Sequence, residues 1–161
     1  MTGPFRVRGA AGAGVRSGLR AEFADADDSP GLLLWRVSHA WQSAQRAALA
    51  PHGLTHVQFV LLASLTWLDS EAPVTQRALA DHARTDPMMT SQVLRALEAK
   101  GLVERRTHPT DARARALAVT HAGSALANRA IVDVEAADRR FFAVLGERSA
   151  GFVAGLRLLG A

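Results

Sequence analysis

The sequence predicts a mainly α-helical fold with one small β hairpin, and three observations predict it. Between residues 30 and 160 most segments repeat their apolar residues every three or four positions, the period of an α-helix. Only two short stretches, at 102–106 and 114–120, have the character of strands. Stretches containing Gly, Pro and Asp separate the segments, so we expect one domain preceded by a tail.

Composition bounds the class of protein. The 161 residues, 48% of them hydrophobic, suffice for one domain with its own core. The sequence has no cysteine, which excludes a disulfide framework, thiolate metal ligands and thiol-based redox sensing by this chain. No apolar run approaches the ~20 residues of a membrane helix, and the N-terminus lacks the apolar centre of a signal peptide. A soluble, cytoplasmic protein without a membrane partner is expected.

Arginine supplies almost all of the positive charge. The formal net charge is +4 and the pI about 11.1, and 18 of the 19 basic residues are arginine, with Lys100 the only lysine. The planar guanidinium suits phosphate and base-edge recognition. A codon preference for Arg and Ala explains the totals better, so the positions of the arginines matter more than their number.

Residues 1–28 are predicted to be a largely disordered N-terminal tail. They are rich in Gly, Ala and Arg, lack a hydrophobic period, and balance four arginines with four acidic residues. Such a segment buries too little surface to offset the entropy cost of ordering.

Two helices are predicted over residues 29–68. Ser29-Pro30 starts the first by placing an N-cap residue before proline at the first helical position, and the helix runs to about Ala50. Its apolar stripe consists of Leu34, Val37, Trp41, Ala44 and Ala48. Residues 51–53 break it. Thr55 caps the second helix, which is apolar nearly all round and is therefore expected at the centre of the fold.

Residues 74–120 contain a helix, a tight turn, a second helix and a hairpin. Thr75 caps the first helix, and residues 84–86 form the turn. Asp86-Pro87 starts the second helix in the way that Ser29-Pro30 starts the first, and Gly101 ends it. This order is the layout of a winged helix-turn-helix, a module that enters DNA grooves.

The second helix of this module has two faces. Thr90, Val93, Leu94 and Leu97 are expected to pack inward, and Met88, Ser91, Gln92 and Arg95 to point outward near its N-terminal half. In a major groove Gln92 would bond adenine, and Arg95 guanine or a phosphate, while Ser91 suits a phosphate and Met88 a thymine methyl. For the helix alone, an ordinary amphipathic helix with a polar solvent face is the better interpretation.

The hairpin favours DNA binding. Its strands at 102–106 and 114–120 flank a turn set by proline and aspartate. Arg113 is expected at the tip, where a narrow minor groove attracts arginine. Phosphates repel Asp111, so this carboxylate is expected to aim Arg113 or Arg115 by an ion pair.

Two further helices are predicted over residues 120–161. Thr120 caps a long helix that runs to about Leu145, Gly146 interrupts it, and a short helix follows over 149–159. Their apolar faces include Phe141, Phe142, Phe152, Leu156 and Leu159. These faces either cover the chain's own core or pair with a second copy. Because a lone recognition helix contacts only one half-site, a homodimer is the stronger expectation.

Five short sequence pieces occur in a specific order. They are Leu54-Thr55 with Gln58-Phe59, Thr75-Gln76, Leu97-Glu98-Ala99-Lys100-Gly101-Leu102-Val103, Asp111-Ala112-Arg113-Ala114, and Leu117-Ala118-Val119-Thr120. In these pieces the chain resembles the MarR family of transcriptional regulators, over about residues 30–160. Each piece is weak alone, but five in the right order are specific.

The resemblance implies a domain organisation and a function. Residues 29–161 would form one MarR-like winged helix domain, with dimerisation helices at 29–68 and 120–161 and the DNA-binding winged helix-turn-helix at 74–120. A homodimer would bind a palindromic operator in double-stranded DNA, usually as a repressor, and many members release DNA when a small aromatic or phenolic ligand binds. The DNA-binding candidates are Thr75, Gln76, Pro87, Met88, Ser91, Gln92, Arg95, Arg105, Asp111, Arg113 and Arg115.

A ligand cleft is predicted beside the first helix. Its candidate residues are Trp35, Ser38, His39, Gln42, His56 and Phe59. The alternative is that Trp35 packs at a dimer interface and that His39 is a satisfied or solvated histidine. His52 and His56 have the four-residue spacing of metal ligands, but His52 precedes the helix, so no metal site and no cofactor is predicted.

No catalytic site is predicted, because the sequence shows no phosphate-binding glycine loop, no paired carboxylates in an apolar setting and no Ser-His-Asp arrangement. Three alternatives stay open. The protein could bind DNA without a small-molecule effector, or use its winged helix only for protein contacts, although the wing arginines weigh against the latter. The tail could be a basic arm that reaches the minor groove.

Overall fold

The computed structural model describes residues 22, 23, 25–68, 73–107 and 115–160. The chain divides into two compact units, Met1–Trp35 and Arg36–Ala161. Most of the predicted tail lies outside the described residues. Within them, the Asp25 side chain accepts a hydrogen bond from Asp27 N and caps a short 3-10 helix, η1 (Ala26–Asp28).

Helix α1 (Pro30–Leu49) begins at the predicted proline, and the Ser29 hydroxyl accepts from Leu32 N at 3.4 Å. The predicted apolar stripe is not a core face over its whole length, since Leu34 and Val37 are 56% and 44% exposed. The buried residues of this helix are Gln45 and Leu49. The predicted break after the helix is confirmed by the 3-10 helix η2 (Ala50–His52) and by Gly53, whose φ of 64° suits glycine.

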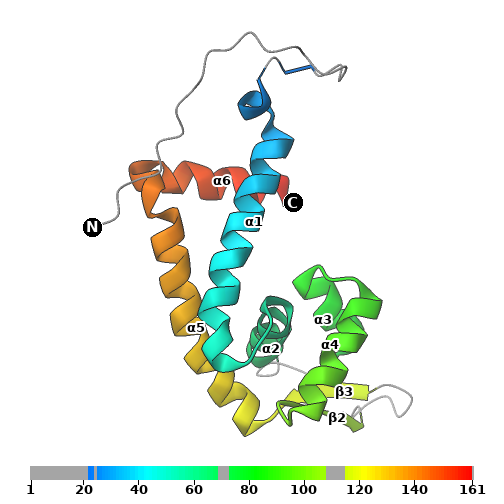
Figure 1. The fold of residues 1–161 in the computed structure, drawn as a ribbon. Coiled ribbons are helices and arrows are strands. Elements are labelled where there is room, and N and C mark those ends of the chain that lie inside the picture. The colour runs from blue at the N-terminus through cyan, green and yellow to red at the C-terminus, as the bar shows by residue number, and fades with distance from the viewer. Residues whose placement is uncertain (1–21, 24, 69–72, 108–114, 161) are drawn as a thin grey trace. The chain divides into compact units, whose positions relative to one another are not determined.

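Helix α2 (His56–Leu68) starts with a reciprocal cap. Gln58 N donates to Thr55 Oγ1 at 3.3 Å, and Thr55 N donates to Gln58 Oε1 at 3.1 Å. Four of its apolar residues are buried: Phe59, Leu61, Leu62 and Leu65. The helix packs against α5 on one side and against α3 and α4 on another (Figure 1). The prediction of a central, buried helix is confirmed.

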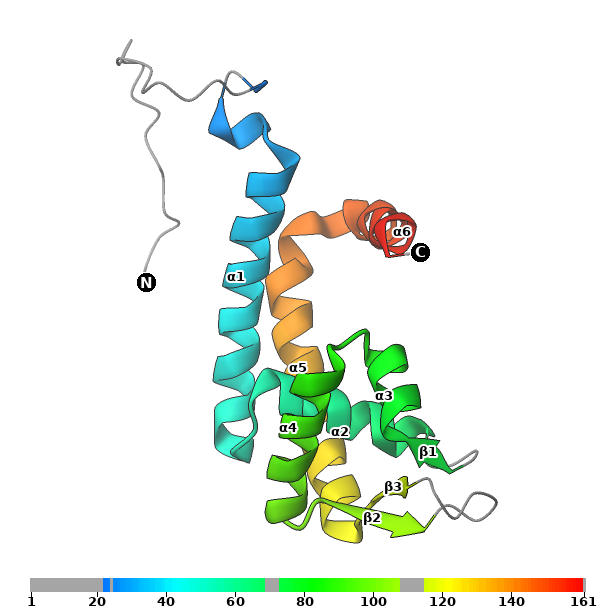
Figure 2. The same ribbon diagram turned by 90° about the vertical axis from the view of Figure 1, so that its right-hand side faces the viewer.

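A three-stranded antiparallel sheet accompanies the helix-turn-helix. Strands β2 (Val103–Thr107) and β3 (Arg115–Val119) form the predicted hairpin. A third strand, β1 (Val74–Thr75), pairs with the other edge of β3, so the strand order is β1-β3-β2 (Figure 2). The sequence did not predict β1, because two residues are too few to show an alternating pattern.

The C-terminal part is helical, as predicted. It consists of α5 (His121–Phe142), a 3-10 segment η3 (Ala143–Arg148) and α6 (Ser149–Leu159). Gly146 interrupts η3 with a φ of 52° and a ψ of −127°. No residue of α6 is buried, and Leu158 and Leu159 are about four-fifths exposed at 82% and 80%.

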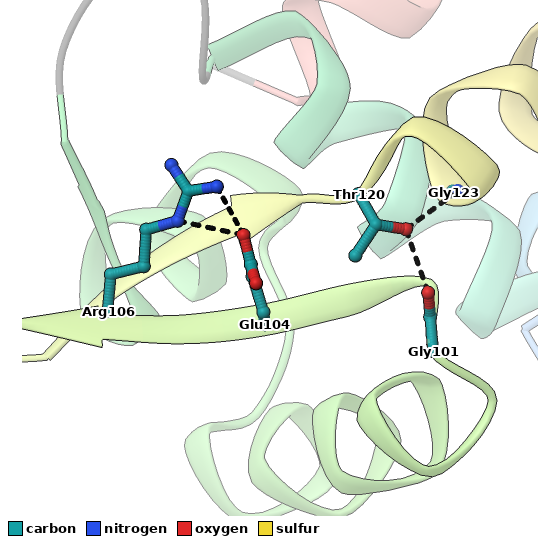
Figure 3. Close-up of polar contacts among 5 residues, drawn as sticks. All are labelled: Gly101, Glu104, Arg106, Thr120 and Gly123. Carbon is teal, nitrogen blue, oxygen red and sulfur yellow. Dashed lines mark hydrogen bonds and ion pairs between the residues drawn. The ribbon is translucent and has the colours of Figure 1, made fainter.

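The start of α5 is fastened to the end of α4 (Pro87–Ala99). Thr120 Oγ1 donates to the Gly101 carbonyl at 2.8 Å and accepts from Gly123 N at 3.0 Å (Figure 3). Thr120 N donates to the Leu102 carbonyl at 3.1 Å. The predicted cap at Thr120 is confirmed, and it also joins α5 to the turn that leaves α4.

No single helix in the described part of the chain is long and apolar enough to cross a membrane. Two consecutive helical segments reach the required length and apolar composition only when they are taken together. They are Pro30–His52 and His56–Leu68, and the chain bends by 72° between them.

Candidate nucleic-acid interface

Helix α3 (Gln76–Ala83) is held at both ends by local hydrogen bonds. The Thr75 hydroxyl accepts from Ala78 N at 3.1 Å, which confirms the predicted cap. At the other end Arg84 has a φ of 49°, and among the described residues it is the only one other than glycine with a positive φ. Thr85 N donates back to the Ala80 carbonyl at 3.0 Å. The turn into α4 is therefore tight.

The N-terminus of α4 is also capped as predicted. Asp86 Oδ1 accepts from Met88 N and from Met89 N, each at 2.9 Å. Inside the turn, the hydroxyls of Thr85 and Thr90 are 2.7 Å apart, and Thr90 Oγ1 also donates to the Asp86 carbonyl at 2.8 Å. Thr90 is fully buried, so these bonds satisfy a hydroxyl that water does not reach. The cap fixes the direction in which α4 leaves the turn.

The two predicted faces of α4 are present. Thr90, Leu94 and Leu97 are fully buried. Met88 is 72% exposed, Gln92 and Arg95 are exposed, and Ser91 is half-buried. Positions 88, 92 and 95 share one side of a helix. An exposed polar side thus lies opposite a packed apolar side.

A shallow hollow lies between α3 and the start of α4. It measures about 350 Å³ and is lined by Gln76, Arg77, Ala80, Asp81 and Pro87. Two predicted DNA-binding residues that are distant in sequence, Gln76 and Pro87, therefore lie near each other.

Arg105 is held by two residues of other elements. Its Nε donates to Glu98 Oε1 at 2.7 Å, and both of its terminal nitrogens lie 3.4 Å from Gln76 Oε1. The structure thus joins the predicted candidates Gln76 and Arg105 directly, and it adds Glu98 as a second partner of Arg105, which the sequence did not identify as part of a site. This contact orients the guanidinium of Arg105 but also occupies it, so any DNA contact by Arg105 has to share these partners.

The remaining wing residues are only partly described. Arg115 is exposed at the first position of β3. On the facing strand, Arg106 Nε donates to Glu104 Oε1 at 2.8 Å (Figure 3). Asp111 and Arg113, the predicted ion pair and tip, lie outside the described residues.

The predicted ligand residues lie in different environments. On α1, Trp35, His39 and Gln42 are exposed and Ser38 is half-buried. On α2, His56 is half-buried, whereas Phe59 is only 5% exposed and belongs to the hydrophobic core. Phe59 therefore offers little surface to a ligand.

The aromatic ring that contacts His56 is Trp41, which was not among the predicted ligand residues. The two rings meet edge to face with centroids 5.0 Å apart. Trp41 Nε1 donates to Asp138 Oδ1 at 2.7 Å, and Gln45 Nε2 donates to the same oxygen at 2.6 Å. Gln45 is fully buried, and its Oε1 has no hydrogen-bond partner among the described residues. We call Trp41, Gln45, His56 and Asp138 the polar cluster.

Next to the polar cluster is a hollow between α1 and α5. It measures about 470 Å³, and its lining consists of Ala44, Ala47, Ala48, Ala137, Arg140 and Phe141. Its walls are apolar apart from the guanidinium of Arg140. The sequence did contain a signal for the cluster and the hollow. Trp41, Gln45 and Ala48 follow one another at intervals of one helical turn, so the polar Gln45 lies between two apolar residues on the same side of α1.

Burial lowers the pKa of His56 below its ordinary value of 6.5; the nearby Asp138 carboxylate opposes this effect, and Arg46 adds to it. The folded protein therefore favours neutral His56 more than the unfolded chain does. We predict that the free energy of unfolding falls as the pH drops from 6.5 through the lowered pKa, and that this loss is absent above 6.5. Urea unfolding at a series of pH values between 5 and 8 measures this change in the free energy of unfolding. In His56→Phe the dependence should be smaller, and an unchanged pH profile in that variant would contradict the assignment.

No group of three or more potential metal ligands occurs in the part of the chain that the structure describes. His52 does not pair with His56; its Nε2 lies 2.7 Å from Asp133 Oδ2 on α5.

Comparison with known proteins places these features in a family context. A profile of the MarR family matches residues 54–114. The HTH-type transcriptional regulator YdcH of Bacillus subtilis is 40% identical over 140 residues, which cover 86% of this chain and 95% of that protein. The HTH-type transcriptional repressor Rv2887 of Mycobacterium tuberculosis is 41% identical over 122 residues, 74% of this chain and 85% of that protein.

Solved structures agree with the sequence comparison. Rv2887 in complex with DNA superposes with a TM-score of 0.64 at 35% identity, covering 83% of this chain and 98% of that one. The complex of Rv2887 with salicylic acid superposes with a TM-score of 0.65 at 38% identity, again covering 83% of this chain and 98% of that one. CouR from Rhodococcus jostii RHA1 bound to p-coumaroyl-CoA superposes with a TM-score of 0.72 at 28% identity, covering 83% of this chain and 92% of that chain.

Proposed function

The chain belongs to the MarR family of HTH-type transcriptional regulators, a family of regulators rather than enzymes. From this premise we propose that the protein is a cytoplasmic repressor and that it binds a palindromic operator as a homodimer. The observation that carries the proposal is the exposed side of α4. Met88, Gln92 and Arg95 project from a helix whose opposite side is fixed by buried Leu94 and Leu97. A side chain on so well-packed a helix meets DNA in a defined geometry.

The apolar surface of the terminal helices supports the dimer. On α1 the exposed residues include Leu33, Leu34 and Val37, and on α6 they include Val153, Leu158 and Leu159. Large exposed apolar residues in adjacent positions mark interaction sites. Two copies joined through these helices would present two recognition helices, as a palindrome requires.

Binding of wild-type protein to DNA from the region upstream of its own gene tests this proposal. Phosphate contacts release counterions, so we expect the affinity to fall steeply, by about 10³-fold or more between 50 and 200 mM salt if six or more phosphates are contacted. Fluorescence anisotropy with a labelled duplex measures the slope. An affinity that is insensitive to salt would reject DNA binding through phosphate contacts. A mass of 17.1 kDa, that of a single chain, in light scattering at micromolar concentration would reject the homodimer.

We further propose that a small aromatic acid releases the protein from DNA. Relatives support this, since Rv2887 was solved with salicylic acid and CouR with p-coumaroyl-CoA. In this chain, the hollow between α1 and α5 has apolar walls for a ring and Arg140 for a carboxylate. The predicted residues Trp35, Ser38, His39, Gln42, His56 and Phe59 remain the other candidate site. A repressor that responds to no small molecule is the alternative.

Salicylate should therefore raise the melting temperature. At a concentration of 100 times Kd, a ligand specific for the folded state stabilises by about 2.7 kcal/mol, which corresponds to roughly 5–10 °C here. Benzyl alcohol, which lacks the carboxylate, is the control ligand. Loss of the shift in Arg140→Met but not in Gln42→Ala would favour the hollow, and the reverse would favour the face of α1. No shift across a panel of aromatic acids would support the alternative.

A further inference from the structure

The only lysine of the chain makes contacts unlike those of a DNA-binding side chain. Lys100 caps the C-terminus of α4, where its backbone N donates to the Ala96 carbonyl at 3.2 Å. Its Nζ donates to the Gly53 carbonyl at 2.7 Å and to Gln58 Oε1 at 3.1 Å. Both acceptors lie in or beside the turn between α1 and α2. The ammonium group is therefore directed at the protein.

The acceptors of Lys100 are themselves fixed. Gln58 Oε1 also accepts from Thr55 N at 3.1 Å, as part of the cap of α2. Gly53 has a φ of 64°, a conformation that few other residues adopt without strain. One residue before it, His52 Nε2 lies 2.7 Å from Asp133 Oδ2 of α5. The turn is thus joined to α5 by His52 and to α4 by Lys100.

We propose that Lys100 is a positioning residue, which holds the C-terminus of the recognition helix α4 to the α1–α2 turn and thereby sets the angle of α4 relative to α5. Thr120, which bonds the Gly101 carbonyl at 2.8 Å, supports α4 next to this contact from the α5 side. Lys100 stands about 20 Å along the helix from Pro87, at a rise of about 1.5 Å per residue. It thus lies at the opposite end of α4 from the N-terminal turns, about 7.5 Å along the helix beyond Arg95, the nearest residue of α4 proposed to contact DNA. The inference rests on the proposed DNA binding.

The proposal and a phosphate contact predict different salt behaviour. If Lys100 positions α4, Lys100→Met should weaken operator binding about fivefold and leave the slope of log affinity against log salt unchanged. If Lys100 contacts a phosphate, the slope should fall by about one. Lys100→Arg keeps the charge at the helix end and should recover part of the loss. Arg139→Met, which removes an exposed charge on α5, is the matched control and should leave the affinity unchanged.

A double-mutant cycle tests the contact itself. Lys100→Met and Gln58→Met should each weaken binding, and the double variant should be no weaker than the more affected single variant. A charge that only stabilises the end of α4 would give additive effects with Gln58→Met. Additive effects, an affinity unchanged in Lys100→Met, or a reduced salt slope would each overturn the proposal.

The single lysine also permits a measurement without DNA. With ¹⁵N-lysine labelling, the NMR spectrum contains one side-chain ammonium signal, that of Lys100 Nζ. We expect its hydrogen exchange with water to be at least about tenfold slower than that of free lysine, and Gln58→Met to accelerate it. Exchange as fast as in free lysine would overturn the proposal. If wild-type protein bound no operator while this exchange was slow, the DNA-binding proposal would fail and the contact would stand.

Discussion

Gly123→Ala is expected to destabilise the fold more than any other single-methyl addition to a helix in this protein. A Cβ at this position would lie 2.0 Å from the Leu102 carbonyl oxygen and 2.9 Å from its carbonyl carbon. Both are backbone atoms, and the same oxygen accepts from Thr120 N. The helix therefore cannot give way without losing its cap. We expect a loss of at least about 3 kcal/mol and a fall in melting temperature of roughly 10 °C.

A matched substitution separates this clash from the ordinary effect of alanine. Gly151 on α6 also lies within a helix, and a Cβ there would meet no atom within 4 Å among the described residues. Gly151→Ala should leave stability unchanged or raise it by up to ~1 kcal/mol, because alanine favours the helix. Thermal and urea unfolding measure both variants. Equal stabilities for the two would show that α5 does not approach Leu102 as closely as described.

Replacement of Gln92 or Arg95 by alanine should weaken operator binding strongly while leaving the fold intact. Both side chains are exposed on the same side of α4, and neither contributes to the buried face formed by Thr90, Leu94 and Leu97. A specific base contact contributes about 1–3 kcal/mol, so each variant should bind roughly 5–150-fold more weakly. The double variant should retain only non-specific binding.

The salt dependence of these variants distinguishes the two kinds of contact. If Arg95 bonds a phosphate, its removal lowers the salt slope by about one and weakens all sequences alike. If Gln92 bonds an adenine, its removal changes the base preference at one position and leaves the slope unchanged. Arg139→Ala is the control for loss of charge. Affinities of both α4 variants within twofold of the wild type would contradict the assignment of α4 as the recognition helix.

The start and end of nearly every helix could be predicted from sequence. Thr75, Asp86 and Thr120 each cap the helix that follows them, and Gly101 adopts a φ of 67° after α4. These signals are strong because a cap is made by residues two or three positions apart. The inward and outward faces of α4 were predictable for the same reason, since a helical period is a local property.

Contacts between distant residues were not predictable in the same way. The sequence suggested Arg105 and Gln76 as separate DNA contacts, whereas in the structure Arg105 bonds Gln76 directly and Glu98 as well. It suggested Trp35 and His39 for a ligand cleft, whereas the ring against His56 is that of Trp41. Side chains on one helix compete for the same neighbour, and periodicity does not say which of them reaches it.

The sequence by itself determined the kind of protein, because capping residues, helical periods and the five ordered pieces are read along the chain. The tertiary structure alone decided which groups meet across it: Gly123 against the Leu102 carbonyl, Lys100 against Gly53, and Trp41 and Gln45 on Asp138. Trp41 and Asp138 are separated by 97 positions in the sequence, and Gln45 and Asp138 by 93. Such contacts depend on how α1, α4 and α5 pack, and that packing is a cooperative property of the whole core rather than of any one segment.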